Sequence, residues 1–191
     1  MRVFLKSAAT VLGGVALGVV VTWFTLMRGA GMGGDVTDGP WRTSLLIGSN
    51  QSGMMLRAMV ALHGLLALNR SETVYYTATA DSAGAKLSGT ACYAIEGRDP
   101  PARWWSITAY GADDFLIPNK ENRYAVSKNA VIRGDDGAFT ITASGRAKGA
   151  NTLATGERTF SLTLCLYNPD PRVVADPAHA ALPSIRAVAC R

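Results

Sequence analysis

The residues best suited to chemistry gather in one segment, residues 104–124. Aromatic rings beside amide, carboxylate and guanidinium groups suit a saccharide, which offers ring faces for apolar contact and hydroxyls for hydrogen bonds. The same residue types also stabilise loops, because Asn and Asp side chains bond to nearby backbone groups. The segment therefore predicts either a ligand-binding site or a well-bonded loop. Its candidate ligand-binding residues are Trp104, Tyr110, Asp114, Asn119, Asn122, Arg123 and Tyr124.

A hydrolase acting on envelope carbohydrate is the alternative interpretation of this segment. Asp114 or Glu121 would then act as acid or base, and Arg123 would orient the substrate. Glycosidases need two carboxyls about 5–9.5 Å apart facing one substrate, whereas adjacent residues such as Asp113 and Asp114 tend to point apart. The sequence contains no Walker, serine-hydrolase or zinc-protease motif. We assign no catalytic residue, and binding without catalysis is the first interpretation.

Three cysteines bear on compartment and stability. In an oxidising compartment they allow one disulfide and one free thiol. The pairing of Cys92 with Cys190 is favoured, because it would close a loop of about 98 residues and hold the C-terminus in place. Cys165 alternates with leucines in a β-type pattern and is expected to be a packed thiol. A redox role for it would require an exposed thiol with a lowered pKa.

Neither a metal nor another cofactor is expected. The chain has two histidines, His63 and His179, and neither lies at ligand spacing from a cysteine. His63 falls on the apolar face of a predicted helix, where a buried side chain is the simpler interpretation.

The N-terminus carries a candidate membrane anchor. Residues 7–27 contain no charge, and at 1.5 Å per residue they would reach about 31 Å, the thickness of a hydrocarbon core. A cleaved signal peptide is the competing interpretation, but its apolar region is usually only about 7–15 residues long. An uncleaved anchor is favoured. Gly14 and Gly18 form a small-xxx-small pair that would allow a helix–helix contact within the membrane.

The charges around this span predict its orientation. Arg2 and Lys6 precede it and Arg28 follows it, so the positive-inside rule places the N-terminus in the cytoplasm. The expected location is the bacterial inner membrane, crossed once, with the C-terminal domain in the periplasm. Removing these three residues from the 19 Lys and Arg leaves 16 against 14 Asp and Glu, so the net charge of +5 falls to +2. A nucleic-acid partner is therefore not expected.

The composition pattern divides the chain into four parts: a cytoplasmic tip at 1–6, the anchor at 7–28, a Gly-rich tether at 29–40 and an exported domain at 41–191. Apolar spacing predicts one helix over 54–68. Alternation and turn residues predict strands over 73–79, 87–95, 103–110, 123–127, 138–144, 160–167 and 185–189, the first two forming a hairpin. The Pro-rich stretch 168–183 is expected to lie extended. The fold class is mainly β, an antiparallel β-sandwich with one N-terminal helix, preceded by a transmembrane helix.

Four longer motifs stand out in the exported part: G-P-W-R-T at 39–43, A-L-N-R-S-E-T-V-Y-Y at 67–76, W-S-I-T-A-Y-G-A-D-D-F-L-I-P-N-K-E-N-R-Y at 105–124 and S-L-T-L-C-L-Y-N-P at 161–169. Together they resemble a known family, the bacterial domain-of-unknown-function family 1214, in its short, singly anchored branch. The resemblance implies a small β-sandwich of the cell envelope and no established reaction. It is compatible with binding of a partner protein or with an accessory subunit of a larger membrane complex. Gly111 stands where family members often carry an acidic residue, which weakens a catalytic role for that turn.

Overall fold

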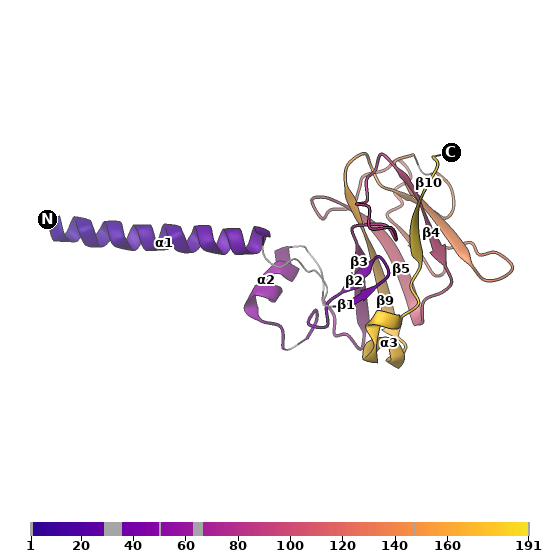
Figure 1. The fold of residues 1–191 in the computed structure, drawn as a ribbon, viewed down its shortest axis with the longest axis horizontal. Coiled ribbons are helices and arrows are strands. Elements are labelled where there is room, and N and C mark those ends of the chain that lie inside the picture. The colour runs from indigo at the N-terminus through magenta and orange to yellow at the C-terminus, as the bar shows by residue number, and fades with distance from the viewer. Residues whose placement is uncertain (1, 29–35, 50, 63–66, 147, 191) are drawn as a thin grey trace.

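A computed structural model describes residues 2–28, 36–49, 51–62, 67–146 and 148–190. The long helix α1 (Arg2–Arg28) precedes a β domain with two short helices and a 3-10 turn. Its part Lys6–Phe24 has a mean hydropathy of 1.8 and is not buried, so α1 is long and apolar enough to cross a membrane. Figure 1 shows it projecting away from the domain along the long axis of the molecule.

The β domain consists of two sheets, as the alternating pattern predicted. One has the strand order β1-β2-β3-β9-β5-β6 and the other β10-β4-β7-β8. All pairs are antiparallel except β7 with β8. The strands are β1 (Val36–Asp38), β2 (Trp41–Thr43), β3 (Thr73–Ala78), β4 (Cys92–Gly97), β5 (Ala102–Gly111), β6 (Ala125–Ser127), β7 (Phe139–Ser144), β8 (Thr152–Ala154), β9 (Phe160–Pro169) and β10 (Ser184–Val188).

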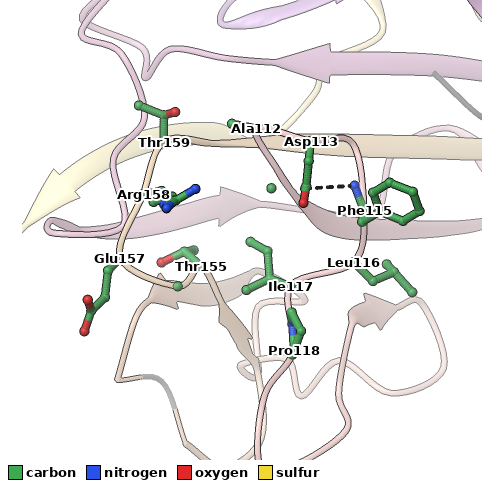
Figure 2. Close-up of a pocket in the computed structure, with 12 residues that line it drawn as sticks. Ala112, Asp113, Phe115, Leu116, Ile117, Pro118, Thr155, Glu157, Arg158 and Thr159 are labelled. Carbon is green, nitrogen blue, oxygen red and sulfur yellow. Dashed lines mark hydrogen bonds between the residues drawn. The ribbon is translucent and has the colours of Figure 1, made fainter. Parts of the chain in front are cut away.

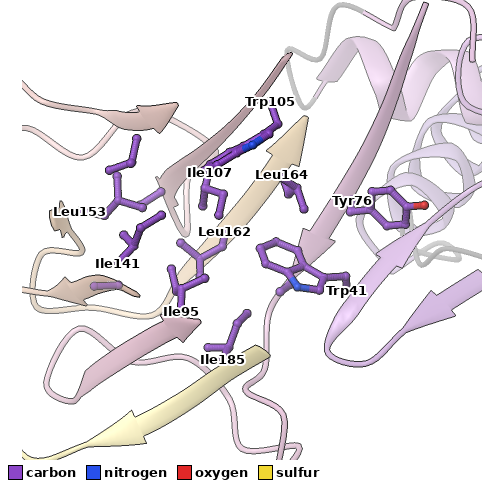
Figure 3. Packing of buried hydrophobic residues seen from close by; sticks show 14 of the residues in the cluster. Trp41, Tyr76, Ile95, Trp105, Ile107, Ile141, Leu153, Leu162, Leu164 and Ile185 are labelled. Carbon is purple, nitrogen blue, oxygen red and sulfur yellow. The ribbon is translucent and has the colours of Figure 1, made fainter. Parts of the chain in front are cut away.

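The core lies between the two sheets. Leu162 and Leu164 of β9 face it from the six-stranded sheet, and Ile95 and Ile141 face it from the four-stranded sheet (Figure 3). All four are fully buried. Because side chains alternate across a strand, each sheet contributes every second residue to this layer. The mainly β sandwich predicted from the sequence is thereby confirmed.

Several local predictions differ from the structure. Residues 36–38, expected in the tether, form β1, and residues 87–91, expected in a strand, precede β4. The predicted hairpin does not form, because β3 pairs with β9 whereas β4 lies in the other sheet. The stretch expected to be extended contains the short helix α3 (Pro171–Ala175) and a 3-10 turn, η1 (Pro177–His179), each beginning at a capping aspartate. Strand β8 was not predicted.

The helix predicted over 54–68 is shorter in its described part. Helix α2 runs over Met54–Leu62, and residues 63–66, including His63, lie outside the described residues. The expectation for His63 is therefore not addressed by the structure. Residues 29–35 of the tether also lie outside the described part of the chain.

The predicted disulfide is present between Cys92 and Cys190, with a Cα–Cα distance of 5.3 Å. Cys92 is the first residue of β4 and pairs with Val188 at the end of β10. The bridge therefore fastens the C-terminal strand to the sheet. Cys165 is the free thiol, as predicted.

Candidate functional site

Two predicted site residues lie on β5 and face away from the core. Trp104 and Tyr110 are half-buried, whereas Trp105 between them is fully buried. The ring centroid of Trp104 is 5.0 Å from that of Tyr167 on β9, in a tilted contact. Both rings therefore belong to the outer face of the six-stranded sheet.

Asn119 fixes the backbone of the loop that follows β5. Its Oδ1 accepts from the backbone N–H of Arg123 at 3.0 Å, and its Nδ2 donates to the carbonyls of Ile117 at 3.2 Å and Arg123 at 2.9 Å. A side chain with its amide committed to the backbone stabilises a loop. The loop interpretation of this residue accounts for all of these bonds.

Arg123 and Glu121 both contact the backbone of Gly149. The Arg123 guanidinium donates to the carbonyl, and Glu121 Oε1 accepts from the N–H at 3.4 Å. Tyr124 donates from its hydroxyl to Asn122 Oδ1 at 3.4 Å. These contacts join the loop after β5 to the segment before β8.

Asp114 lies elsewhere, in the turn directly after β5. Its φ of 63° is in the left-handed region, which Asn and Asp tolerate better than most residues. Asp113 Oδ1 accepts from the Phe115 N–H at 3.2 Å, and the N–H of Gly111 donates to the Phe115 carbonyl at 2.9 Å. The three residues of the hydrolase interpretation are therefore not brought together. Glu121 and Arg123 contact the backbone of Gly149, and Asp114 lies in a separate turn.

This turn lines an open pocket that the sequence did not predict. Figure 2 shows the pocket, which has a volume of about 570 Å³, within the range of small-molecule sites. Its second wall is the segment before β9, residues 155–159. The polar sequence of this segment, T-G-E-R-T, indicates a turn and no binding site. Ionic groups and apolar side chains share the lining. The pocket is lined by residues 111–113, 115–118 and 155–159.

The pocket contains a buried hydroxyl without a partner. Thr155 is 2% exposed, and its Oγ1 makes no hydrogen bond with any described residue. Figure 2 shows Thr155 below Arg158 and to the left of Ile117 in that view. An unpaired buried polar group costs about 1–3 kcal/mol. The Oγ1 atom is less than 1 Å² exposed, so a ligand or a water molecule reaches it only when the side chain turns toward the cavity.

Ionic side chains stand beside this hydroxyl. Arg158 and Glu157 are exposed, and the described residues provide neither side chain with a hydrogen bond or an ion pair. Asp113 lines the pocket from the other segment, and its Oδ2 is not used by the Phe115 bond. The pocket therefore offers both donors and acceptors. Phe115, 74% exposed, adds an aromatic ring at its edge.

Glycines allow the pocket's second wall to lie close to two other segments of the protein, at Gly89 and Gly145. A Cβ at Gly89 would lie 2.2 Å from the Gly156 carbonyl oxygen, and one at Gly145 would lie 2.6 Å from it. Gly156 itself has a φ of 63°. Because a side chain at Gly89 or Gly145 would displace the backbone of Gly156, these two glycines permit its close approach.

Cys165 lies on the outer face of the six-stranded sheet, opposite Tyr75 on β3 and Ser106 on β5. Burial raises the pKa of its thiol to about 11, and burial with the neighbouring cysteine raises the pKa of Tyr167 to about 12. The thiolate is the reactive form, and it is scarce at neutral pH under these conditions. The lowered pKa required for a redox role is therefore not found.

Among the described residues, no three His, Cys, Asp or Glu side chains lie together where they could hold a metal ion. On α1, a Cβ at Gly14 or Gly18 would meet no atom within 4 Å. Their helix–helix contact stays a prediction.

Comparisons with known proteins bear on family and fold. A family model described as "Protein of unknown function (DUF1214)" matches residues 72–171. This confirms the family that the motifs indicated, while the singly anchored branch stays a prediction. No curated protein matches the chain in sequence.

Two solved structures resemble the chain. The VPA0106 protein from Vibrio parahaemolyticus has a TM-score of 0.62 and 24% identity, and the match covers 86% of this chain and 42% of that one. An uncharacterized protein from Burkholderia cenocepacia has a TM-score of 0.43 and 16% identity, covering 61% of this chain and 29% of that one. The chain spans less than half the length of either protein, and the first likeness shows the shared fold.

Proposed function

Because this chain belongs to the DUF1214 family, whose description states no function, we propose a function from its own pocket and its apolar helix. We propose that it is a membrane-anchored domain of the bacterial cell envelope that binds a saccharide in the pocket between residues 111–118 and 155–159. The anchor is α1, and the domain stands in the periplasm at the outer face of the inner membrane.

The observation that carries the proposal is the buried, unpartnered hydroxyl of Thr155 in the pocket wall. Once the Thr155 side chain turns toward the cavity, a ligand that bonds to Oγ1 would recover the free energy lost by leaving this group without a bond. The site is otherwise formed by backbone that packs closely at Gly89 and Gly145, so it is largely preformed. Preformed sites lose little free energy to ordering when they bind.

The mixed chemistry of the wall favours a saccharide over a simple anion or a lipid tail. Arg158 is a donor, and the carboxylates of Asp113 and Glu157 are acceptors for sugar hydroxyls. Those carboxylates would repel a polyanion, and the ionic groups would be desolvated at a cost by a hydrocarbon chain. Phe115 and Leu116 offer apolar surface to a ring face.

Binding without catalysis is the interpretation that the contacts support. Glu121 and Arg123 are committed to the backbone of Gly149, outside the pocket lining. The carboxylates that the hydrolase interpretation assigned as acid or base, Asp114 and Glu121, both lie outside the pocket lining. Within the proposal, Asp113 and Glu157 serve as hydrogen-bond acceptors.

Thr155→Val tests the proposal, because valine keeps the side-chain shape and removes the hydroxyl. We expect the full chain in detergent micelles to bind N-acetylglucosamine oligomers by calorimetry, and the variant to bind about three- to tenfold more weakly. We also expect the variant to be as stable as the parent or more stable, since it buries no unpaired hydroxyl.

Thr73→Val is the matched control. Thr73 is also a threonine that is 2% exposed, but it lies on β3 outside the pocket lining. Its replacement should leave the affinity unchanged. Equal affinity of parent and Thr155→Val, or no binding of the oligomers by the parent chain, would contradict the proposed site.

A further inference from the structure

Helix α2 has an apolar face that none of the described residues of the β domain covers. Met59 is its buried residue, whereas Met54 is 89% exposed, Leu62 60% and Met55 43%. These three and the exposed Ala58 recur at intervals of three and four, so they share one side of the helix. The outward side of a surface helix is normally polar. This side is apolar and requires another explanation.

The preceding turn carries two more exposed apolar side chains. Leu45 and Leu46 are 38% and 39% exposed, and they lie between β2 and α2. Contiguous exposed apolar surface in a folded domain marks an interaction site with protein or membrane. We define the α2 surface as Leu45, Leu46, Met54, Met55 and Leu62.

The chain itself limits what can cover the α2 surface. Residues 29–35 separate the end of α1 from the start of β1, and even fully extended they reach about 25 Å. If α1 is the membrane anchor proposed above, the domain is confined to the lipid surface. Along the long axis of the molecule, α2 lies at the end of the domain nearest α1 (Figure 1).

The charges of this region fit an anionic lipid surface. Residues 41–71 contain three arginines, Arg42, Arg57 and Arg70, and no acidic residue. Helices that lie in the membrane interface combine an apolar face with flanking basic residues, and each basic residue near an anionic surface contributes about 1 kcal/mol. A protein partner has no comparable support among these observations.

We propose that the α2 surface inserts into the headgroup region of the same membrane that α1 crosses. The domain then has two attachments, the anchor and α2, and this fixes its orientation on the membrane. The inference rests on the proposed anchor. The experiment below distinguishes a failure of the anchor from a failure of the α2 contact.

The test uses the full chain with Cys165→Ser, reconstituted into vesicles of phosphatidylethanolamine and phosphatidylglycerol. Met54→Cys and Leu62→Cys are labelled one at a time with a fluorophore, and quenching by nitroxide-labelled lipid is measured. Ile132→Cys is the matched control, because Ile132 is 62% exposed and follows β6, far from α2 in sequence. We expect at least about threefold stronger quenching at positions 54 and 62 than at 132.

Equal quenching at the three positions would overturn the inference, as would efficient crosslinking between copies through position 62, which would assign the surface to a second copy. An alkaline carbonate wash addresses the anchor separately. Protein that the wash removes from vesicles contradicts anchoring by α1. Protein that resists the wash but is quenched equally at all positions contradicts only the role of α2.

Discussion

Trp41 and Tyr76 are core aromatic residues that also bond to the C-terminal segment. Trp41 Nε1 donates to the Pro183 carbonyl at 2.6 Å, and the Tyr76 hydroxyl donates to the Pro177 carbonyl at 2.9 Å. Asp38 Oδ2 accepts from the N–H of Ala180 at 2.9 Å in the same region. Trp41 belongs to the motif G-P-W-R-T and Tyr76 to the motif A-L-N-R-S-E-T-V-Y-Y, so both motifs hold the C-terminal segment in place.

Tyr76→Phe should lower the free energy of unfolding by about 1–2 kcal/mol, because it leaves the buried Pro177 carbonyl without its donor. Chemical denaturation of the full chain in detergent measures this. Tyr124→Phe is the matched control, since its hydroxyl bonds at 3.4 Å to an exposed asparagine and should contribute little. Equal losses in the two variants would show that the bond to Pro177 is not what stabilises the segment.

At the scale of elements, the disulfide completes an attachment that β10 begins. Strand β10 pairs with β4 from Ser184 to Val188, and Cys190 is then joined to Cys92. The last residues of a domain are usually poorly ordered unless they are held. The disulfide therefore holds the C-terminal end of β10, which is an edge strand of the four-stranded sheet.

Cys190→Ser should lower the free energy of unfolding by about 2–5 kcal/mol, because the sequence separation of 98 residues makes the bridge a strong constraint on the unfolded chain. Thermal unfolding of the full chain in detergent measures the change. Cys165→Ser removes a thiol outside the bridge and should have a much smaller effect. A Cys190→Ser variant as stable as Cys165→Ser would contradict this role.

At the scale of the whole molecule, the proposed topology follows from charges at the two ends of α1. Replacing Arg2 and Lys6 by asparagine should reduce the fraction of chains with a periplasmic C-terminus, because it removes the cytoplasmic positive charge. A C-terminal alkaline phosphatase fusion, active only after export, measures that fraction. Arg28→Asn is the control and should preserve or increase export. Loss of activity with Arg28→Asn instead would contradict the orientation.

The alternation of side chains made the strands and their inner faces predictable. On β9, Leu162, Leu164 and Leu166 are buried while Thr163 and Cys165 between them are half-buried, as their sequence pattern requires. The sequence predicted residues 104–124 as one candidate region, but the structure separates its residues into different places. Its amide and guanidinium groups bond within loops, and only its residues around the turn after β5 reach the pocket.

The sequence by itself determined the features that depend on neighbours along the chain. These are the apolar span of α1, the faces of most strands, the turn residues and the family motifs, because periodicity and propensity act over a few residues. The tertiary structure alone decided that β3 pairs with β9 and that residues 111–118 meet residues 155–159. Strand pairs and cavities form between segments that are far apart in the sequence. The alternation of apolar and polar residues predicts which face of a strand is buried, but it does not predict which strand lies beside it. Thr155 became a candidate only when its burial, its unpaired hydroxyl and the pocket were seen together.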